Sequence, residues 1–559
     1  MQKKIIYLTL FLMIFHAASA KVGLVLSGGG ARGFAHVGVL KVIDELNIKI
    51  DYIAGTSIGA VVGALYAQGY SAIEIEEILL NDYFEDVIEG KISREDLYIG
   101  EKRWLPSSNY YFDISENFTP KLPRSLFLGN RLTNKFFQYY FPSTDCNDFD
   151  DLHVPFRTVA TDIVTGEKKV FDSGSLHEAV RASASVPSLI APFELENKLY
   201  VDGGVRANFP TEVVREMGAD IVIGIRVNTG LKEEDELNSL LQIYDQTLNI
   251  SIADNVGQSL KLCDILIQPK LEDINVSDFK MRNEIISLGE CAAREQVEQL
   301  NELAKNSRPY LKKNLENMTF GKIEVEGNSH LSSTKVREFV GLKKDIAYSC
   351  EDICDAIEHA YCSKLFDVIY PTIESKNNIN ILTLKILEAK RKKVGVGIVY
   401  DNEDELVLGA TLELNNVLQR NSKLLVNLKI GGKQELNVDY VKNFGKLYGA
   451  YYRLFPYVRE SIIYSYNENH EKENSVLSLE SGGTLGVGFF AEDAIIAEFY
   501  GFGLHNRLYR HIAEFEDTDF VSSGFGLKLY HESLDDVLFP TRGGSIFAKL
   551  SVSRKELFS

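Results

Sequence analysis

The chain has 559 residues, which is more than one compact core usually needs and predicts about three domains. Apolar residues make up 45% and charged residues 25% of the chain, so the composition excludes a largely disordered protein and a bundle of membrane-spanning helices. The net charge of −19 argues against a nucleic-acid-binding protein, because phosphate backbones require a basic surface.

The first 20 residues have the pattern of a secretory signal peptide. Lys3 and Lys4 precede an apolar run from Ile5 to Phe15, and small residues end the segment at Ala20. The alternatives are an N-terminal anchor or a buried strand, but this run is too short to cross a bilayer core of about 30 Å. We therefore expect export through the inner membrane and removal of residues 1–20.

Residues 21–314 alternate short apolar runs with longer helical patterns. The strand-like runs are VGLVLSG, DYIAGTS, FRTVATDIV, KLYVDGG, DIVIGIRV and DILIQP. Helical patterns extend over Val37–Leu46, Ile58–Ala67 and Glu284–Lys305. This alternation predicts an α/β domain whose mostly parallel sheet is covered by helices on both faces.

The first strand leads into a glycine-rich loop, SGGGARG. The spacing of Gly28, Gly30 and Gly33 is also that of a dinucleotide-binding loop. A dinucleotide site requires an acidic residue near the end of the second strand, whereas Asp51 stands at the beginning of that strand. The sequence therefore lacks the acidic residue that would confirm a dinucleotide site, and we do not favour nucleotide binding.

The second strand leads into the stretch GTSIGA, in which Ser57 lies between Gly55 and Gly59. A serine between two glycines, after a strand and before a helix, is the pattern of a nucleophile elbow. The glycines permit a strained turn, and the N-terminus of the following helix favours developing negative charge. The motif predicts that Ser57 is a nucleophile, although glycines with this spacing also occur by chance.

A serine nucleophile needs hydrogen-bond donors for the oxyanion that it creates. The backbone amides of Gly28, Gly29 and Gly30 can supply them, because no side chains obstruct the approach of a substrate. Arg32 can add positive charge to this oxyanion site, unless it is an ordinary surface arginine.

The serine also needs a base, and the stretch YVDGG offers a carboxylate at the end of a strand. Asp202 is followed there by Gly203 and Gly204, so it lies beside a tight turn at the edge of the sheet. Asp202 is either the base or a plain turn residue. Three histidines of this segment lie in no recognisable catalytic motif: His36, His153 and His177.

In this order, the motifs SGGGARG, GTSIGA and VDGG resemble the patatin-like phospholipase family. The resemblance implies a catalytic dyad with Ser57 as nucleophile and Asp202 as general base, and an oxyanion site at the Gly28 to Gly30 loop with Arg32. Ser27 stands where many members carry aspartate, although serine also occurs there. The family cleaves acyl esters of glycerophospholipids without a metal or another cofactor. Nothing in residues 21–314 has the spacing of a calcium loop or of a zinc-binding histidine pair.

The rest of the chain changes its periodicity twice. Residues 318–390 predict a small β-α-α-β-β domain, and from residue 391 to 559 apolar and polar residues alternate in long runs such as ELVLGATLEL and FVSSGFGLKLY. Long strands rich in glycine and aromatic residues fit an antiparallel transmembrane β-barrel, with a soluble β-sandwich as the alternative. After residue 20 no apolar run is long enough for a membrane-spanning helix, so a spanning structure must use strands.

The small domain is similar to a POTRA domain, and the alternating region, with LFPTRGG at Leu538–Gly544, resembles the barrel of outer-membrane surface antigens. The whole arrangement resembles the type Vd autotransporter phospholipases. This resemblance implies an outer-membrane protein that needs the barrel assembly machinery and carries its α/β domain at the cell surface or releases it. About ten strand-like runs are fewer than the barrels of that family contain, so we expect a partial barrel. The alternative function is a catalytically inactive surface protein that binds lipid or acts as an adhesin or assembly factor.

One further stretch has aromatic residues at helical spacing. In Leu126–Pro142 the residues Leu128, Leu132, Phe136 and Tyr140 share one face. We predict that this face packs in the core; the alternative is a lid or an acyl channel.

Overall fold

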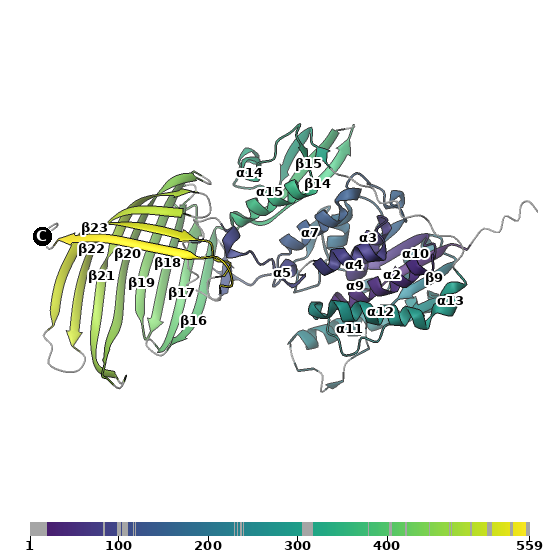
Figure 1. Cartoon of the computed structure of the whole chain (residues 1–559), viewed down its shortest axis with the longest axis horizontal. Coiled ribbons are helices and arrows are strands. Elements are labelled where there is room, and N and C mark those ends of the chain that lie inside the picture. The colour runs from purple at the N-terminus through teal and green to yellow at the C-terminus, as the bar shows by residue number, and fades with distance from the viewer. Residues whose placement is uncertain are drawn as a thin grey trace, which may run out of the picture.

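In the computed structural model the chain forms an α/β domain, a small domain and a large antiparallel sheet. They follow one another along the chain, as the colours from purple to yellow show in Figure 1. The structure describes residues 20–554 with gaps, the longest of which are 103–109, 304–316 and 511–516. The expected signal peptide lies outside the described residues except for Ala20. None of the described helices is both long and apolar enough to cross a membrane.

The α/β domain is built on an eight-stranded sheet. Five of its strands are parallel, in the order β10-β9-β1-β2-β5, and β6, β7 and β8 complete the sheet with antiparallel pairing. The prediction of a mostly parallel sheet is therefore confirmed. The strands are β1 Val22–Leu26, β2 Tyr52–Thr56, β5 Phe156–Asp162, β6 Lys168–Phe171, β7 Phe193–Leu195, β8 Lys198–Asp202, β9 Ile221–Ile225 and β10 Ile265–Ile267.

Helices cover both faces of this sheet, which explains why the adjacent strands β1 and β9 carry no polar side chain. On β1, Leu24 and Leu26 pack into one core cluster and Val25 packs into another on the opposite face, as the two-residue period of a strand requires. The main helices are α2 Ala35–Glu45, α3 Ile58–Ala67, α4 Ala72–Asn81, α5 Phe84–Glu89, α7 Asn130–Tyr140, α8 Leu176–Ser183, α9 Gly204–Ala207, α10 Thr211–Glu216, α11 Leu240–Ser259, α12 Arg282–Glu295 and α13 Val297–Asn301.

Helices α2 and α12 pack with their backbones in close contact. A β-carbon at Gly38 would lie 1.9 Å from the Ile286 carbonyl oxygen, and one at Gly289 would lie 2.0 Å from the Ala35 carbonyl oxygen. The single helix predicted over residues 284–305 was wrong, because it ends at Glu295 and α13 begins after Gln296. Glutamine is an ordinary helix former, so the periodicity gave no sign of this break.

The aromatic stripe of the sequence lies mainly in the core. Phe136 and Tyr140 of α7 are buried in the core of the α/β domain, whereas Phe137 and Phe141 pack into the core of the small domain. Leu128 is 44% exposed and precedes the helix, so its inclusion in the stripe was wrong. The lid or acyl channel thus has no support from α7, whose apolar residues join two hydrophobic cores.

The small domain follows the predicted β-α-α-β-β order. Its strands form the order β12-β15-β14, and its helices are capped by Ser332 and by a Ser349–Asp352 capping box. A short pair of strands, β11 Met318–Thr319 and β13 Ala347–Tyr348, lies beside them. The elements are β12 Lys322–Glu326, α14 Ser333–Val340, α15 Cys350–Cys362, β14 Phe366–Lys376 and β15 Ile379–Glu388.

The C-terminal region is an antiparallel meander in which each strand from β16 to β24 pairs with the next. The described part of this region has nine strands, close to the roughly ten runs expected, and within it the sheet is not closed. The strands are β16 Lys392–Asp401, β17 Glu405–Asn415, β18 Ser422–Gly431, β19 Gln434–Gly445, β20 Tyr448–Tyr466, β21 Lys472–Ala491, β22 Ile495–Arg510, β23 Thr518–Glu532 and β24 Ser545–Arg554.

Two strands of this sheet come from the segment assigned to the α/β domain. β3 Tyr110–Ile114 pairs antiparallel with β16, and β4 Pro120–Lys121 pairs with β3, which brings the sheet to eleven strands among the described residues. Nearby, Arg94 forms a buried ion pair with Glu532 of β23. The α/β segment therefore contributes to the C-terminal sheet, which its sequence did not predict.

Candidate active site

Ser57 lies in a sharp turn between the end of β2 and the first residue of α3. Its backbone has φ 54° and ψ −125°, a conformation that non-glycine residues rarely adopt and that turns at functional sites often require. A β-carbon at Gly55 would lie 2.4 Å from the Gly59 carbonyl oxygen, and one at Gly59 would lie 2.4 Å from the Leu26 carbonyl oxygen. The two flanking glycines thus allow the backbone to pass closely through the turn that presents Ser57.

The structure brings Asp202 to Ser57. Asp202 is the last residue of β8, and its carboxylate lies beside the Ser57 side chain, which lowers the pKa of the Asp202 carboxyl. The Asp202 Oδ1 atom also accepts a hydrogen bond of 2.7 Å from the amide of Gly204, which with Gly203 forms the turn into α9. Both side chains of the pair are buried, each residue being 8% exposed.

The environment of Asp202 raises the pKa of its carboxyl. Burial raises this pKa to about 6, and the hydrogen bonds from Ser57 and Gly204 oppose the rise by stabilising the carboxylate. A carboxylate with this pKa is ionised at neutral pH and accepts a proton more readily than an exposed aspartate does. The pair can therefore act as a hydroxyl nucleophile with its base.

The glycine loop lies directly beside Ser57. A β-carbon at Gly28 would lie 3.1 Å from the Ser57 β-carbon. The Gly28 amide donates to the Asn208 carbonyl oxygen at 3.2 Å, whereas within the described structure no hydrogen bond engages the amides of Gly29 and Gly30. The amides of Gly29 and Gly30 thus remain able to donate to a substrate oxygen, whereas the Gly28 amide already donates to the Asn208 carbonyl oxygen.

Arg32 is a fully buried residue of the short 3₁₀ helix that follows this loop. Its Nε atom donates to the Ile274 carbonyl oxygen at 2.7 Å. The alternative of an ordinary surface arginine was therefore wrong. The Nε hydrogen bond of this buried guanidinium anchors the segment around Ile274 to the residues that follow the glycine loop.

Two of the three histidines are buried and hydrogen-bonded to residues other than Ser57 and Asp202. His36 is buried and its Nε2 is hydrogen-bonded to the Ser27 carbonyl oxygen at 2.8 Å, and burial lowers the pKa of its ring to about 4. His177 is bonded through Nδ1 to the Ser175 hydroxyl, and burial, with a smaller effect from Lys385, lowers its pKa to about 3. His153 lies in the bend before β5.

Sequence reasoning missed two serines that hold the Ser57–Asp202 pair. Ser183 Oγ accepts a hydrogen bond of 3.0 Å from the Ser57 amide, and the Ser185 carbonyl oxygen accepts one of 2.8 Å from the Asp202 amide. Both serines belong to the stretch RASASVP. This stretch follows a helical pattern, but its spacing does not indicate contact with Ser57 or Asp202.

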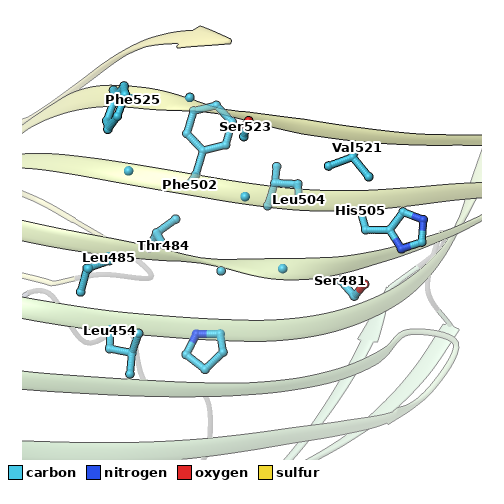
Figure 2. A pocket seen from close by; sticks show the side chains of 16 residues that line it. Leu454, Ser481, Thr484, Leu485, Phe502, Leu504, His505, Val521, Ser523 and Phe525 are labelled. Atoms are coloured by element: carbon cyan, nitrogen blue, oxygen red, sulfur yellow. The ribbon is translucent and has the colours of Figure 1, made fainter. Parts of the chain in front are cut away.

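A cavity of about 590 Å³ lies on strands β20 to β23 of the large sheet, and Figure 2 shows its lining. Gly501 and Gly503 belong to this lining, and a β-carbon at Gly503 would have no atom within 4 Å among its described neighbours. Because none of the predicted site residues lines this cavity, it is separate from the Ser57–Asp202 pair. In the described part of the chain, no group of three or more histidine, cysteine, aspartate or glutamate residues is placed to hold a metal ion.

Comparison with known proteins places the α/β domain in a family. Residues 24–215 match the family model described as patatin-like phospholipase. The chain is 32% identical over 223 residues to the human patatin-like phospholipase domain-containing protein 6, covering 39% of this chain and 14% of that protein. It is 29% identical over 240 residues to the Saccharomyces cerevisiae lysophospholipase NTE1, covering 42% of this chain and 13% of that protein. The chain thus spans about one seventh of the length of these curated relatives.

Solved structures show more distant likenesses. VipD from Legionella pneumophila aligns with a TM-score of 0.28 and 15% identity, covering 51% of this chain and 67% of that one. BamA from Haemophilus ducreyi, lacking POTRA domains 1–3, aligns with a TM-score of 0.32 and 18% identity, covering 42% of this chain and 48% of that one. The family match carries the assignment, and it confirms the resemblance that the three motifs predicted: the α/β domain of this chain is a patatin-like phospholipase domain.

Proposed function

We propose that the chain is a serine acyl hydrolase that cleaves phospholipid esters. The observation that carries the proposal is the placement of Ser57, held at a strained strand–helix turn, beside the buried carboxylate of Asp202. Ser57 Oγ attacks the ester carbonyl carbon while Asp202 takes the hydroxyl proton. The tetrahedral oxyanion is stabilised by the amides of Gly29 and Gly30, the positive charge of Arg32 and the N-terminus of α3.

The intermediate then collapses and expels the alcohol, a lysophospholipid, which takes the proton from Asp202 as it leaves. This step leaves an acyl ester on Ser57. A water molecule attacks that ester, gives a proton to Asp202 and releases the fatty acid, after which the proton returns to Ser57 Oγ. The same carboxylate serves as base and acid in turn, so the reaction needs no histidine.

Reaction with a serine-directed fluorophosphonate tests this function. We expect one covalent adduct on Ser57 in the wild-type protein, followed by fatty-acid release from diacyl phospholipids in a lipid panel. Release of free fatty acid together with lysophospholipid would identify a phospholipase A. A folded protein that binds phospholipid vesicles and remains unlabelled would support the inactive lipid-binding protein instead.

We also propose that the large sheet attaches the protein to the outer membrane, as part of a POTRA-containing autotransporter of type Vd that displays its patatin-like domain. Large apolar side chains such as Leu485, Phe499 and Leu527 are exposed on one face of the sheet. On the other face Glu498 is buried and Arg453 is half-buried. This alternation is the pattern of a lipid-facing sheet. Fractionation of cells tests the proposal, because recovery of the protein only in the soluble fraction would contradict it.

The activity should depend on pH through the ionisation of Asp202. The base must be deprotonated, so kcat/KM is expected to be constant well above the pKa of about 6 and to fall tenfold per pH unit well below it. A pH–rate profile with a soluble acyl ester measures this, and circular dichroism over the same range controls for unfolding. If kcat/KM instead begins to fall only near pH 4, the ordinary pKa range of an exposed aspartate, the buried carboxylate is not the base.

The reaction should also be insensitive to chelators. In the proposed mechanism Asp202 activates Ser57 directly, so no metal-bound water is required. Rates of ester hydrolysis before and after dialysis against EDTA should agree within error. Loss of activity that calcium restores would contradict the proposed dyad.

A further inference from the structure

Helix α8 contacts the candidate dyad at its C-terminal end. Ser183 Oγ accepts a hydrogen bond of 3.0 Å from the Ser57 amide and donates one of 2.6 Å to the Val159 carbonyl oxygen. Just beyond the helix, the Ser185 carbonyl oxygen accepts a hydrogen bond from the Asp202 amide. Because β5 lies between β2 and β8, this short segment spans the two strands that carry Ser57 and Asp202.

The same helix contacts the small domain through Glu178. The Glu178 side chain is only 5% exposed, and its Oε1 accepts hydrogen bonds from the Tyr370 hydroxyl at 3.1 Å and from Lys385 Nζ at 2.7 Å. Tyr370 on β14 and Lys385 on β15 are direct cross-strand partners. A buried carboxylate requires such partners, because leaving its charge unpaired destabilises the fold.

Aromatic packing fixes α8 against the same strands. The His177 ring meets Phe137 edge-on at 5.4 Å between centroids and Tyr370 at 6.3 Å, and Tyr370 also packs on Phe193 at 5.8 Å. Figure 1 shows the small domain beside α7, where the Ile369 amide donates to Asn130 at 2.7 Å. Helix α8 is thus held by the small domain at one end and holds the dyad at the other.

We propose that the small domain is a positioning element of the hydrolase. Its β14–β15 hairpin fixes α8 through Glu178, and α8 fixes the distance between Ser57 and Asp202 through Ser183 and Ser185. This inference rests on the proposed function. Its consequence is that a change in how the small domain docks alters the rate of the chemical step rather than the binding of substrate.

The test compares Lys385→Met, Ser183→Ala and the double variant in the full chain, with a soluble acyl ester. Each single change should lower kcat by roughly 3- to 30-fold while KM changes less than about twofold. Lys385 and Ser183 act along one path in this proposal, so the double variant should be little slower than the slower single variant. Fluorophosphonate labelling counts the competent sites and corrects for unfolded protein.

Arg131→Met is the matched control. Arg131 of α7 forms an ion pair with Glu358 of α15, with a hydrogen bond of 3.0 Å from its Nε, so it crosses the same domain interface without touching α8. We expect this variant to keep the wild-type kcat. If Lys385→Met folds poorly because Glu178 is left as a buried unpaired charge, Glu178→Gln with Lys385→Met removes that charge and the same loss of kcat is expected.

The outcomes separate the two proposals. A folded wild-type protein that neither hydrolyses esters nor reacts with the fluorophosphonate would overturn the proposed function. An active wild type with unchanged kcat in Lys385→Met, or with effects of Lys385→Met and Ser183→Ala that multiply independently, would overturn the positioning role and leave the hydrolase intact. An equal loss in Arg131→Met would also overturn it, because general docking rather than α8 would then control the rate.

Discussion

Asp202→Asn should lower kcat by about 10²- to 10⁴-fold without unfolding the protein, which is the usual loss when a general base is removed. The amide has the size of the carboxylate and retains an oxygen for the hydrogen bond from Gly204. It cannot take a proton from Ser57, so the hydroxyl loses its activation. Single-turnover kinetics with a chromogenic ester measure the effect, and thermal melting checks the fold.

Ser57→Ala should lose at least as much activity, and combining it with Asp202→Asn should add little, because the two residues act as a unit. His36→Ala, His153→Ala and His177→Ala provide the comparison. The first and third of these remove buried rings and are expected to reduce stability. The rate per folded site should stay close to that of the wild type in His36→Ala and His153→Ala. In His177→Ala, which loses the packing of α8 on Tyr370, the rate should fall by no more than the roughly 3- to 30-fold loss expected of a positioning contact. Loss of acyl-enzyme formation in a folded histidine variant, with Asp202→Asn still active, would show that a different residue is the base.

Gly38→Ala should strongly destabilise the α/β domain. The new methyl group would lie 1.9 Å from the Ile286 carbonyl oxygen, so α2 and α12 must move apart along their contact. Overpacking of this kind costs about 3 kcal/mol when backbone atoms cannot adjust locally, which corresponds to a fall in melting temperature of roughly 6–12 °C. Calorimetry of the full chain should resolve this shift.

Gly257→Ala is the control for the change from glycine to alanine. Gly257 also lies in a helix, α11, but no atom lies within 4 Å of its added β-carbon. Alanine favours helix over glycine by up to about 1 kcal/mol, so this variant should be as stable as the wild type or slightly more stable. Equal stability of Gly38→Ala and Gly257→Ala would mean that the helices tolerate a wider separation than their packing indicates.

Local sequence signals predicted the parts of the candidate site that depend on neighbouring residues. The elbow at Ser57 and the turn after Asp202 could be predicted because a strand, a glycine and a polar side chain follow one another directly in the chain. The same holds for the central strands, whose continuous apolar runs reflect burial on both faces.

Contacts between distant segments could not be predicted in this way. Nothing in the spacing of RASASVP shows that Ser183 meets Ser57, because that hydrogen bond depends on how α8 crosses β5. The pairing of Gly28 with Asn208 and of β3 with β16 likewise depends on tertiary packing, which periodicity does not encode. Leu128 fits the helical period of α7 but lies before its first turn.

A protease that cuts the connector between β15 and β16 would not set the patatin-like domain free. β3 would remain hydrogen-bonded to β16, and Arg94 would remain paired with Glu532, so the two fragments would stay together as one nicked particle. Freeing the domain would require further cuts before Arg94 and after Lys121, and these would sever the domain's own chain. The β3–β4 insertion thus makes the link between the patatin-like domain and the sheet independent of the covalent connector.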